Sequence, residues 1–376
     1  MLKFALYRPA QMSRELWQAY TALRNARAIY DDPFFDPDFA RLVGEVREDT
    51  RIGVATKGED VVGVWPLHER PGGWSRPIGG PFSDWHGPIV QPEHNLTAQT
   101  FLNGLGLSGM TVFGLQPQAE PMPKGMTRVG ANMTDISMGW NAYFAAQQQA
   151  WPKHFKKMRR LYRNVERDFS ELQFNWDDRS DTSFKRLIGL KQDQFARTGF
   201  HDVLKPEWAR GLLDRLRSYE GPRMRVRLAT LCFDGQHAAS EMNLQSDTVM
   251  HGWLTGFERD LGGYSPGNML VQEMLPQMPG EGIQTYDAGP GLDHYKRHYA
   301  NFQLPVDSGT LRGNAKTVAP ARLAGKAWRW GEGVMPAKAG ELMKRARRRM
   351  DQVSLAELSV GARISGVVGA LGQREL

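Results

Sequence analysis

The chain has 376 residues, a formal net charge of +7 and 41% hydrophobic residues, which is a globular composition with enough length for more than one domain. One cysteine, Cys232, excludes an intramolecular disulfide and a cysteine-cluster zinc site. The sequence contains no run of about 20 apolar residues and no signal-peptide pattern at its start, so we expect a cytoplasmic protein, and its positive charge favours an anionic partner.

The first 145 residues alternate helical and strand patterns. We expect helices over Ser13–Tyr30 and Leu96–Leu107, and strands over Ile52–Ala55, Val61–Leu67 and Met110–Leu115. Between them, residues 70–92 are rich in Gly, Pro and Trp and predict an ordered loop or the wall of a cleft. Within this loop, the candidates for binding a sugar are Asp84, Trp85 and His86, with ordinary loop packing as the alternative.

A long basic helix is expected next, over Trp140–Asp168. Seven Lys and Arg lie between Lys153 and Arg167, against one acid, Glu166. Such a helix either presents a solvated charged face or joins two domains and also holds an anionic ligand.

The second half predicts two helices, three antiparallel strands, a Gly-rich turn, a helix and a last strand. The expected elements are helices over Thr182–Gly199 and Trp208–Tyr219, and strands over Arg223–Phe233, Ala238–Gln245, Val249–Phe257 and Gln284–Asp287. Asp234-Gly235 is typical of a hairpin turn between the first two strands. The last strand is expected to pair in parallel with Val249–Phe257, because a helix of the right length connects them.

The Gly-rich turn and the helix after it, residues 257–270, read FERDLGGYSPGNML. Ser265 is expected to cap the helix with its side chain, and Pro266 suits the first helical position. Free amides at such a helix start can hold a phosphate group. The alternative is a turn with a purely structural role.

The last 70 residues change in character, since apolar content falls from about Val306 onward. A dense basic cluster, KRARRRM, spans Lys344–Met350, and Ser354–Leu371 is weakly amphipathic. This tail is either solvated or forms a surface helix that binds acidic lipid, a nucleotide or a partner.

Several short segments, in this order, are similar to one protein family. They are DPFFDPDF, PLHERPGG and GGPFSDWHGPIV in the first half, and SPGNML, YDAGPG and YKRHYA in the second. In these segments the chain resembles the large bacterial GNAT-like proteins of the CelD/BcsL type, which are linked to cellulose and exopolysaccharide biosynthesis. The resemblance implies an α/β fold with tandem GNAT-like domains, each a mixed, mostly antiparallel sheet flanked by helices, as in the FemABX peptidyltransferases. We expect these domains at residues 1–145 and 146–306, followed by a basic tail at residues 307–376.

The resemblance also implies that the second domain binds acetyl-CoA as donor and needs no metal. The strand before the Gly-rich turn would supply a backbone donor to the thioester carbonyl, and the turn would hold the pyrophosphate. These roles fall on Leu254, Thr255, Phe257, Arg259, Gly262, Gly263, Tyr264, Ser265, Pro266, Gly267 and Asn268. Tyr264 departs from the common R/Q-x-x-G-x-G/A signature, which has Gly or Ala at that position.

Acyl transfer to an amine benefits from a general base. Glu241 is the first candidate and Asp287 the second, with an exposed strand position and a turn cap as the respective alternatives. Tyr295 and Tyr299 lie one helical turn apart. Either one is a candidate acid that protonates the leaving thiolate, and the alternative is that both pack in the core. Lys296 is a candidate contact for phosphates of the donor or acceptor, and we expect neither His237 nor His251 to bind a metal.

The resemblance therefore implies an acetyl-CoA-dependent N- or O-acetyltransferase that acts on a sugar or nucleotide sugar in exopolysaccharide assembly, without a nucleic-acid partner. One alternative is a Fem-like transferase that uses aminoacyl-tRNA and binds it through the basic helix at Lys153–Arg167. The other is a non-catalytic interaction protein that contacts the inner face of the membrane, or an anionic nucleotide, through its basic tail.

Overall fold

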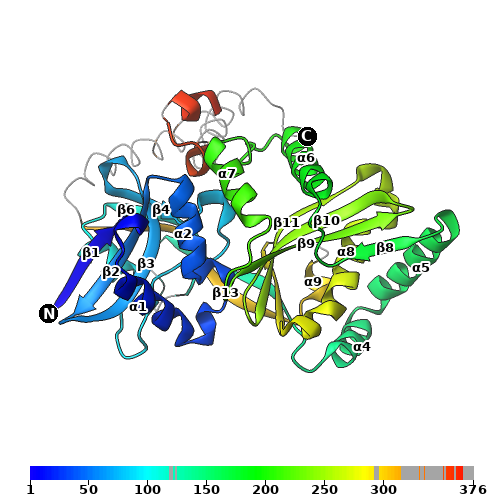
Figure 1. The fold of residues 1–376 in the computed structure, drawn as a ribbon, viewed down its shortest axis with the longest axis horizontal. Coiled ribbons are helices and arrows are strands. Elements are labelled where there is room, and N and C mark those ends of the chain that lie inside the picture. The colour runs from blue at the N-terminus through cyan, green and yellow to red at the C-terminus, as the bar shows by residue number, and fades with distance from the viewer. Residues whose placement is uncertain are drawn as a thin grey trace.

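The computed structural model describes residues 1–117, 122, 125–291, 296–314, 330, 334, 350, 353–359 and 361–366. Its centre is a 13-stranded mixed sheet with the strand order β1-β2-β3-β4-β6-β13-β7-β12-β11-β10-β9-β8, and β5 pairs with β3. Helices flank this sheet on both halves of the molecule (Figure 1). The expected α/β class with a mixed, mostly antiparallel sheet is confirmed.

The strands and helices of the first half include the predicted ones and also strands at Leu2–Tyr7, Trp74–Pro77 and Ile89–Val90, which the sequence patterns do not predict. They are β1 (Leu2–Tyr7), α1 (Arg14–Asn25), α2 (Pro37–Val46), β2 (Thr50–Lys57), β3 (Asp60–Glu69), β4 (Trp74–Pro77), β5 (Ile89–Val90), α3 (Ala98–Gly104), β6 (Gly109–Leu115) and β7 (Met126–Asp135). Short 3-10 turns lie between them at Pro9–Gln11, Ala28–Tyr30, Pro33–Phe35, Pro71–Gly73 and Gly80–Phe82. The predicted first helix is therefore too long, since α1 ends at Asn25.

The expected long basic helix consists of two helices, α4 (Trp140–Ala150) and α5 (Pro152–Asp168). They separate at Trp151 because Pro152 has no backbone N–H and occupies the first position of α5. The apolar side of α5 is buried, whereas its seven Lys and Arg residues are all exposed. The basic face of α5 is thus open to solvent.

The elements of the second half include the predicted ones in the predicted order and also strands at Leu172–Asn175 and Phe302–Arg312, which the sequence patterns do not predict. They are β8 (Leu172–Asn175), α6 (Asp181–Thr198), α7 (Glu207–Leu216), β9 (Arg225–Phe233), β10 (Gln236–Gln245), β11 (Val249–Phe257), η6 (Arg259–Tyr264), α8 (Pro266–Met274), η7 (Leu275–Glu281), β12 (Thr285–Pro290), α9 (Lys296–Tyr299) and β13 (Phe302–Arg312). Asp234 and Gly235 both have positive φ, as a tight hairpin turn between β9 and β10 requires. β12 pairs in parallel with β11 after the α8 crossover, as predicted.

The two halves share one sheet because β13 returns to its middle (Figure 1). One edge of β13 pairs with β6 and the other with β7, while β7 also pairs with β12. Asp307 on β13 forms an ion pair with Arg128 on β7 at 2.7 Å. The expected tail therefore does not begin at residue 307, since the sheet continues to Arg312.

One buried core also spans both halves. It joins Phe34 and Phe39 of the first half to Leu212 on α7, Met242 on β10 and Leu254 on β11. A second core packs α5 and α8 against the opposite face of the second-half strands, and a third lies within the first half around Trp65 and Phe101. Shared burial of this kind fixes the halves against each other.

The described part of the C-terminal segment packs on its own chain. Val353 and Ala356 are fully buried, and Trp208 Nε1 on α7 donates a hydrogen bond of 2.7 Å to the Ala356 carbonyl. Arg70, which follows β3, donates to the Ser354 carbonyl at 2.8 Å. Figure 1 shows this segment beside α7. The basic cluster at Lys344–Met350 lies outside the described residues, apart from Met350.

No helix among the described residues is long and apolar enough to cross a membrane.

Candidate active site

The central strands of the second half separate where β11 leaves β12. Their parallel pairing ends at the pair His251 and Asp287, and β11 continues to Phe257 beside β10. The pairing of β10 with β11 also shifts, since Met242 faces Leu254 and Asn243 faces Gly252. Trp253 is therefore an extra residue, and this bulge bends β11 at the point where the strands separate.

A cavity of about 970 Å³ lies at this separation. Its walls come from α6, β10, β11, β12, the turn into α8, and one loop of the first half. The predicted site residues on its wall are Asp84, Glu241, Thr255, Phe257, Arg259, Gly262, Ser265, Pro266, Gly267, Asn268 and Lys296. The structure thus brings together residues that lie far apart in the sequence.

The start of α8 forms one end of this cavity. Ser265 has a φ of 55° in the left-handed region and precedes Pro266, the first residue of the helix. Its side chain makes no capping hydrogen bond, so the expected cap is wrong. Asn268 Oδ1 is buried on the wall without a hydrogen-bond partner among the described residues. A ligand at the helix start would meet backbone amides and this unpaired amide group.

Tyr264, the departure from the common signature, is turned away from the cavity. Its hydroxyl donates a 2.8 Å hydrogen bond to Asp168 at the end of α5, and its ring packs edge-on against Phe169 at 5.4 Å. Neither Tyr264 nor Gly263 is among the residues that line the cavity. The tyrosine therefore leaves the space at the helix start open, and both residues are corrected as donor contacts.

Glu241 lies on β10 with only 1% of its surface exposed. Its carboxylate accepts hydrogen bonds from the Thr255 hydroxyl at 2.7 Å and from the Tyr286 hydroxyl at 2.8 Å. Burial raises the pKa of Glu241, although both hydrogen bonds act in the opposite direction. A carboxylate with a raised pKa on a cavity wall suits general acid–base catalysis. The alternative of an exposed strand position is wrong.

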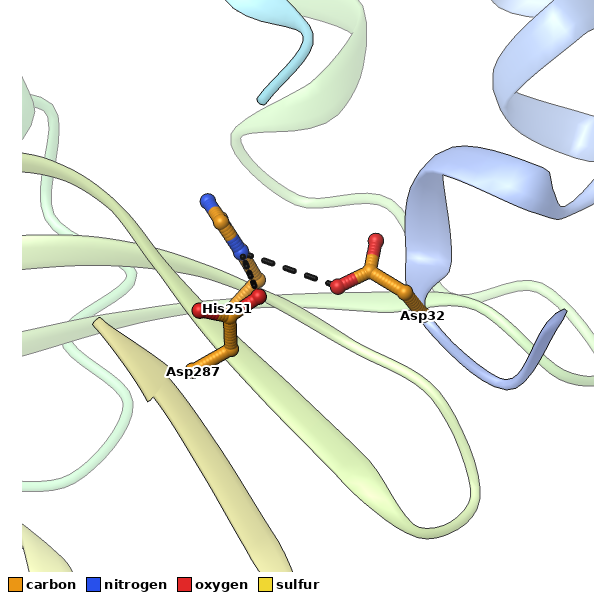
Figure 2. Close-up of side chains that lie close together, drawn as sticks. All are labelled: Asp32, His251 and Asp287. Carbon is orange, nitrogen blue, oxygen red and sulfur yellow. Dashed lines mark hydrogen bonds and ion pairs between the residues drawn. The ribbon is translucent and has the colours of Figure 1, made fainter. Parts of the chain in front are cut away.

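Asp287 does not reach the cavity wall. It is fully buried and belongs to a cluster with His251 and Asp32 (Figure 2). Asp287 Oδ2 lies 3.0 Å from His251 Nδ1 and also accepts a hydrogen bond from Trp85 Nε1. Asp287 Oδ1 accepts from the Gly289 amide at 2.6 Å. With its oxygens occupied in this way, Asp287 is a buried partner of His251 and not a second base at the substrate.

The charge of His251 follows from its partners. Burial alone would lower the pKa of His251, but the carboxylates of Asp287, Asp32 and Asp84 outweigh burial and raise it well above its usual value of 6.5. The His251 cation in turn holds the pKa of Asp287 down, against the effect of burial. Asp32 is different, since burial raises the pKa of Asp32.

The three loop residues predicted to bind a sugar separate in the structure. Asp84 lies on the cavity wall. Trp85 is buried, and its Nε1 donates a hydrogen bond to Asp287. His86 is also buried, and neither of its ring nitrogens has a hydrogen-bond partner among the described side chains. Burial lowers the pKa of His86 to about 3, so this ring is neutral. Trp85 and His86 are therefore corrected as substrate contacts.

Of the two predicted tyrosines, Tyr299 does not line the cavity. Tyr299 is buried behind the wall, where its hydroxyl donates to the Asn268 carbonyl at 3.2 Å and burial raises the pKa of Tyr299. Tyr299 thus supports the start of α8. Tyr295 lies outside the described residues. Leu254 points into the shared core, so only its backbone belongs to the strand beside the cavity.

Sequence reasoning missed several wall residues. Tyr286 and Trp253 line the cavity, and α6 contributes Arg186, Lys191 and Arg197. Tyr286 lies next to Asp287 in the YDAGPG segment, so strand alternation placed one of the two residues toward Glu241. The α6 contacts have no local signal, because they depend on how this helix packs across β11.

Part of the chain matches a known protein family. Residues 152–297 match the family model of the acetyltransferase (GNAT) domain. No curated protein sequence matches the chain. Among solved structures, FemX superposes with a TM-score of 0.53 at 10% identity, covering 82% of this chain and 98% of that chain.

Two further solved structures match with lower scores. A tandem GNAT protein from the clavulanic acid biosynthesis pathway has a TM-score of 0.45 at 11% identity, covering 83% of this chain and 98% of its own. The C-terminal domain of a putative lysylphosphatidylglycerol synthetase from Agrobacterium fabrum has a TM-score of 0.44 at 11% identity. The match covers 82% of this chain and 95% of that chain. The family match identifies a GNAT acetyltransferase domain, and with it an acyltransferase.

Proposed function

We propose that this GNAT-type acyltransferase moves the acetyl group of acetyl-CoA to a primary amine of an amino sugar or nucleotide sugar. One observation carries the proposal: a single cavity connects the start of α8 with the buried carboxylate of Glu241 through the gap between β11 and β12. A donor anchored at the helix start can extend its thioester into that gap, where the acceptor meets it.

The donor end of the cavity fits a pyrophosphate. Gly262 and Gly267 line it without side chains, and a Cβ atom at Gly267 would meet nothing within 4 Å. Arg259 supplies a positive charge on the same wall. A helix start with open space and a nearby cation is favourable for a phosphate ester.

The gap between β11 and β12 exposes backbone groups that can take part in the reaction. Beyond His251, β11 has no partner on its β12 side in the described sheet, so its backbone faces the cavity between Gly252 and Phe257. A backbone amide there would stabilise the negative charge on the thioester oxygen during attack. The amine nitrogen bonds to the carbonyl carbon, the carbon–sulfur bond breaks, and CoA leaves as thiolate.

Glu241 takes the proton that the amine loses in this step. Burial raises the pKa of Glu241, which makes its carboxylate a stronger base, and the Tyr286 hydroxyl donates a hydrogen bond of 2.8 Å to it. The same contact offers a path by which the proton reaches the departing thiolate. In this proposal Tyr286 takes the acid role expected of Tyr295 and Tyr299.

The acceptor class rests on two supports. Trp253 and Phe257 place aromatic rings on the wall, where flat rings can stack on apolar sugar faces. Lys296 adds a cation that suits the phosphate of a nucleotide sugar. A role in exopolysaccharide assembly rests only on the resemblance of the sequence to the CelD/BcsL type.

The test is an acceptor screen that follows free CoA thiol. Purified protein and acetyl-CoA are mixed with glucosamine, galactosamine and amino-bearing nucleotide sugars, and with their hydroxyl counterparts. The proposal expects thiol release that requires an amine and is lost in Glu241→Gln. Release with no acceptor preference, or release unchanged in Glu241→Gln, would contradict it.

A second donor is favoured by one specific observation. The exposed basic face of α5 carries seven cations, and its C-terminal end lies beside η6, where Tyr264 contacts Asp168. An aminoacyl-tRNA, whose backbone is polyanionic, could lie along this face. Competition settles the choice: if charged tRNA at low salt displaces acetyl-CoA and donates its aminoacyl group, the Fem-like reaction replaces the acetyl transfer.

A further inference from the structure

The cluster around His251 lies where the two halves meet. Asp32 and Asp84 come from the first half, and His251 and Asp287 come from the second. His251 is fully buried, and the ring of Phe34 packs edge-on against it at 4.9 Å. Of these four charged residues, only Asp84 lies on the wall of the cavity.

Both nitrogens of the His251 ring face a carboxylate. Nδ1 lies 3.0 Å from Asp287 Oδ2, and Nε2 lies 3.1 Å from Asp84 Oδ2. An ionised carboxylate only accepts hydrogen bonds, so both nitrogens must donate, and only the doubly protonated imidazolium can do so. The ring thereby fixes the position of the Asp84 carboxylate from behind.

The cluster contains more negative than positive groups. One imidazolium faces three carboxyl groups, and no Lys or Arg forms an ion pair with any of them among the described residues. Asp32 Oδ2 lies 3.7 Å from His251 Nδ1 and has no hydrogen-bond partner among the described residues. Even with Asp32 protonated, Asp287 and Asp84 leave one negative charge uncompensated. A buried charge of this kind favours a cationic partner.

The cavity gives the most open approach to this cluster, since Asp32, away from the cavity wall, keeps only 11% of its side chain exposed. Asp84 retains 30% exposure of its side chain, whereas His251 and Asp287 have none. Gly289 lies beside the carboxylate, where a Cβ atom would be 3.2 Å from Asp84 Oδ2, so the absence of a side chain keeps the approach free. The negative charge of the cluster is therefore presented to the cavity at one place.

We propose that Asp84 is a subsite for the ammonium group of the acceptor, and that His251 is the positioning residue that holds it. This inference rests on the proposed acyl transfer and deepens it, because it defines the acceptor as cationic when it binds. The ammonium releases one proton to solvent before the attack, and the resulting amine loses its second proton to Glu241 as described above. The first half of the chain thereby supplies the acceptor contact, while the second half supplies the donor turn and Glu241.

The direct test measures amine binding without turnover. Glucosamine, galactosamine and spermidine, each beside a neutral counterpart such as glucose, are titrated into the full-length protein saturated with CoA, and binding is followed by ligand-observed NMR. We expect the amines to bind and Asp84→Asn to weaken them on the order of 10- to 100-fold, the usual effect of losing a hydrogen bond to a charged group. Asp60→Asn, which removes an exposed negative charge from the first residue of β3 in the same half, serves as the control and should leave amine binding unchanged.

The role of His251 is tested by comparing its effect on the KM for the amine with its effect on the affinity for CoA. His251→Gln should raise the KM for the amine while the affinity for CoA stays unchanged, and folding is checked by the CoA titration itself. If the amines bind wild type and Asp84→Asn equally, or if no amine binds, the subsite is overturned. Amine binding without CoA binding would instead contradict the proposed acyl transfer.

One further outcome would also overturn the inference. Asp32, His251 and Asp287 have ligand atoms within 4.8 Å of one another, a geometry that could hold a metal ion. A stoichiometric metal in the purified protein, removed by a chelator together with amine binding, would make His251 a metal ligand and not an imidazolium. We expect elemental analysis to find no such metal.

Discussion

Glu241 on β10 and Tyr286 on β12 are joined by a 2.8 Å hydrogen bond, although β11 runs between their strands. They meet over Gly252 of β11. A Cβ atom at this position would lie 2.3 Å from the Tyr286 hydroxyl and 2.9 Å from Glu241 Oε1. The contact between the proposed base and its hydroxyl partner thus depends on a residue without a side chain.

Gly252→Ala should therefore separate Glu241 from Tyr286. We expect kcat to fall by at least about tenfold, since the added methyl group displaces one or both side chains, while CoA affinity changes little. Gly280→Ala is the matched control, because a Cβ atom at Gly280 would meet nothing within 4 Å. Equal turnover in the two variants would remove the Glu241–Tyr286 contact from the mechanism.

Glu241→Gln should lower kcat by about 10²- to 10⁴-fold, the usual contribution of a general base. The wild-type rate should rise with pH as Glu241 loses its proton, and burial places this rise above the usual carboxyl pKa of 4.5. In the variant the rise should disappear. A pH–rate profile of kcat/KM for both proteins checks this. If the rise with pH persists unchanged in Glu241→Gln, it belongs to a group other than Glu241.

The stabilisation that His251 gives to the folded protein should be lost as pH rises. The folded-state pKa of His251 lies well above its unfolded value near 6.5, so its stabilising effect is complete below that value. The effect is lost as pH rises through the folded-state pKa. His251→Gln should cost about 3–5 kcal/mol at pH 6, where a buried charge loses its partner, and the gap to wild type should narrow at high pH. Denaturant unfolding across pH measures both; a gap that widens toward high pH would contradict the imidazolium.

Tyr264 should matter for stability and not for the donor. Tyr264→Gly restores the residue type of the common signature, but it removes the ring that packs against Phe169 and Phe233. We expect a lower melting temperature and an unchanged Kd for CoA, measured by thermal unfolding and calorimetry. A large gain in CoA affinity would mean that the tyrosine obstructs the donor site after all.

Much of the second half could be predicted from local patterns. The alternation in β9, β10 and β11, the Asp234-Gly235 turn and the crossover into β12 are each encoded by neighbouring residues. Glu241 and most of the Gly-rich turn lie on the cavity wall, and both stand out in the sequence, as a polar residue within an apolar strand and as a run of glycines before a helix.

The parts that could not be predicted depend on contacts between distant segments. The return of β13 to the middle of the sheet has no local signal, and neither does the meeting of Asp84 with His251. Trp85 was wrongly expected at a substrate because an aromatic residue in a Gly/Pro-rich loop has the same local pattern whether it faces a cavity or a core. Asp287 was misjudged similarly, because its partners Trp85 and His251 come from other elements.

The most direct test of the central claim compares two glycines of the donor turn. Gly267 lines the cavity at the start of α8, whereas Gly263 is exposed and does not line it, and a Cβ atom at either position would meet nothing within 4 Å. Calorimetric titration of acetyl-CoA should show binding to wild type and to Gly263→Glu. It should show none to Gly267→Glu, whose carboxylate would occupy and repel the pyrophosphate. Absence of binding to wild type, or equal loss in both variants, would contradict a donor site at this helix start.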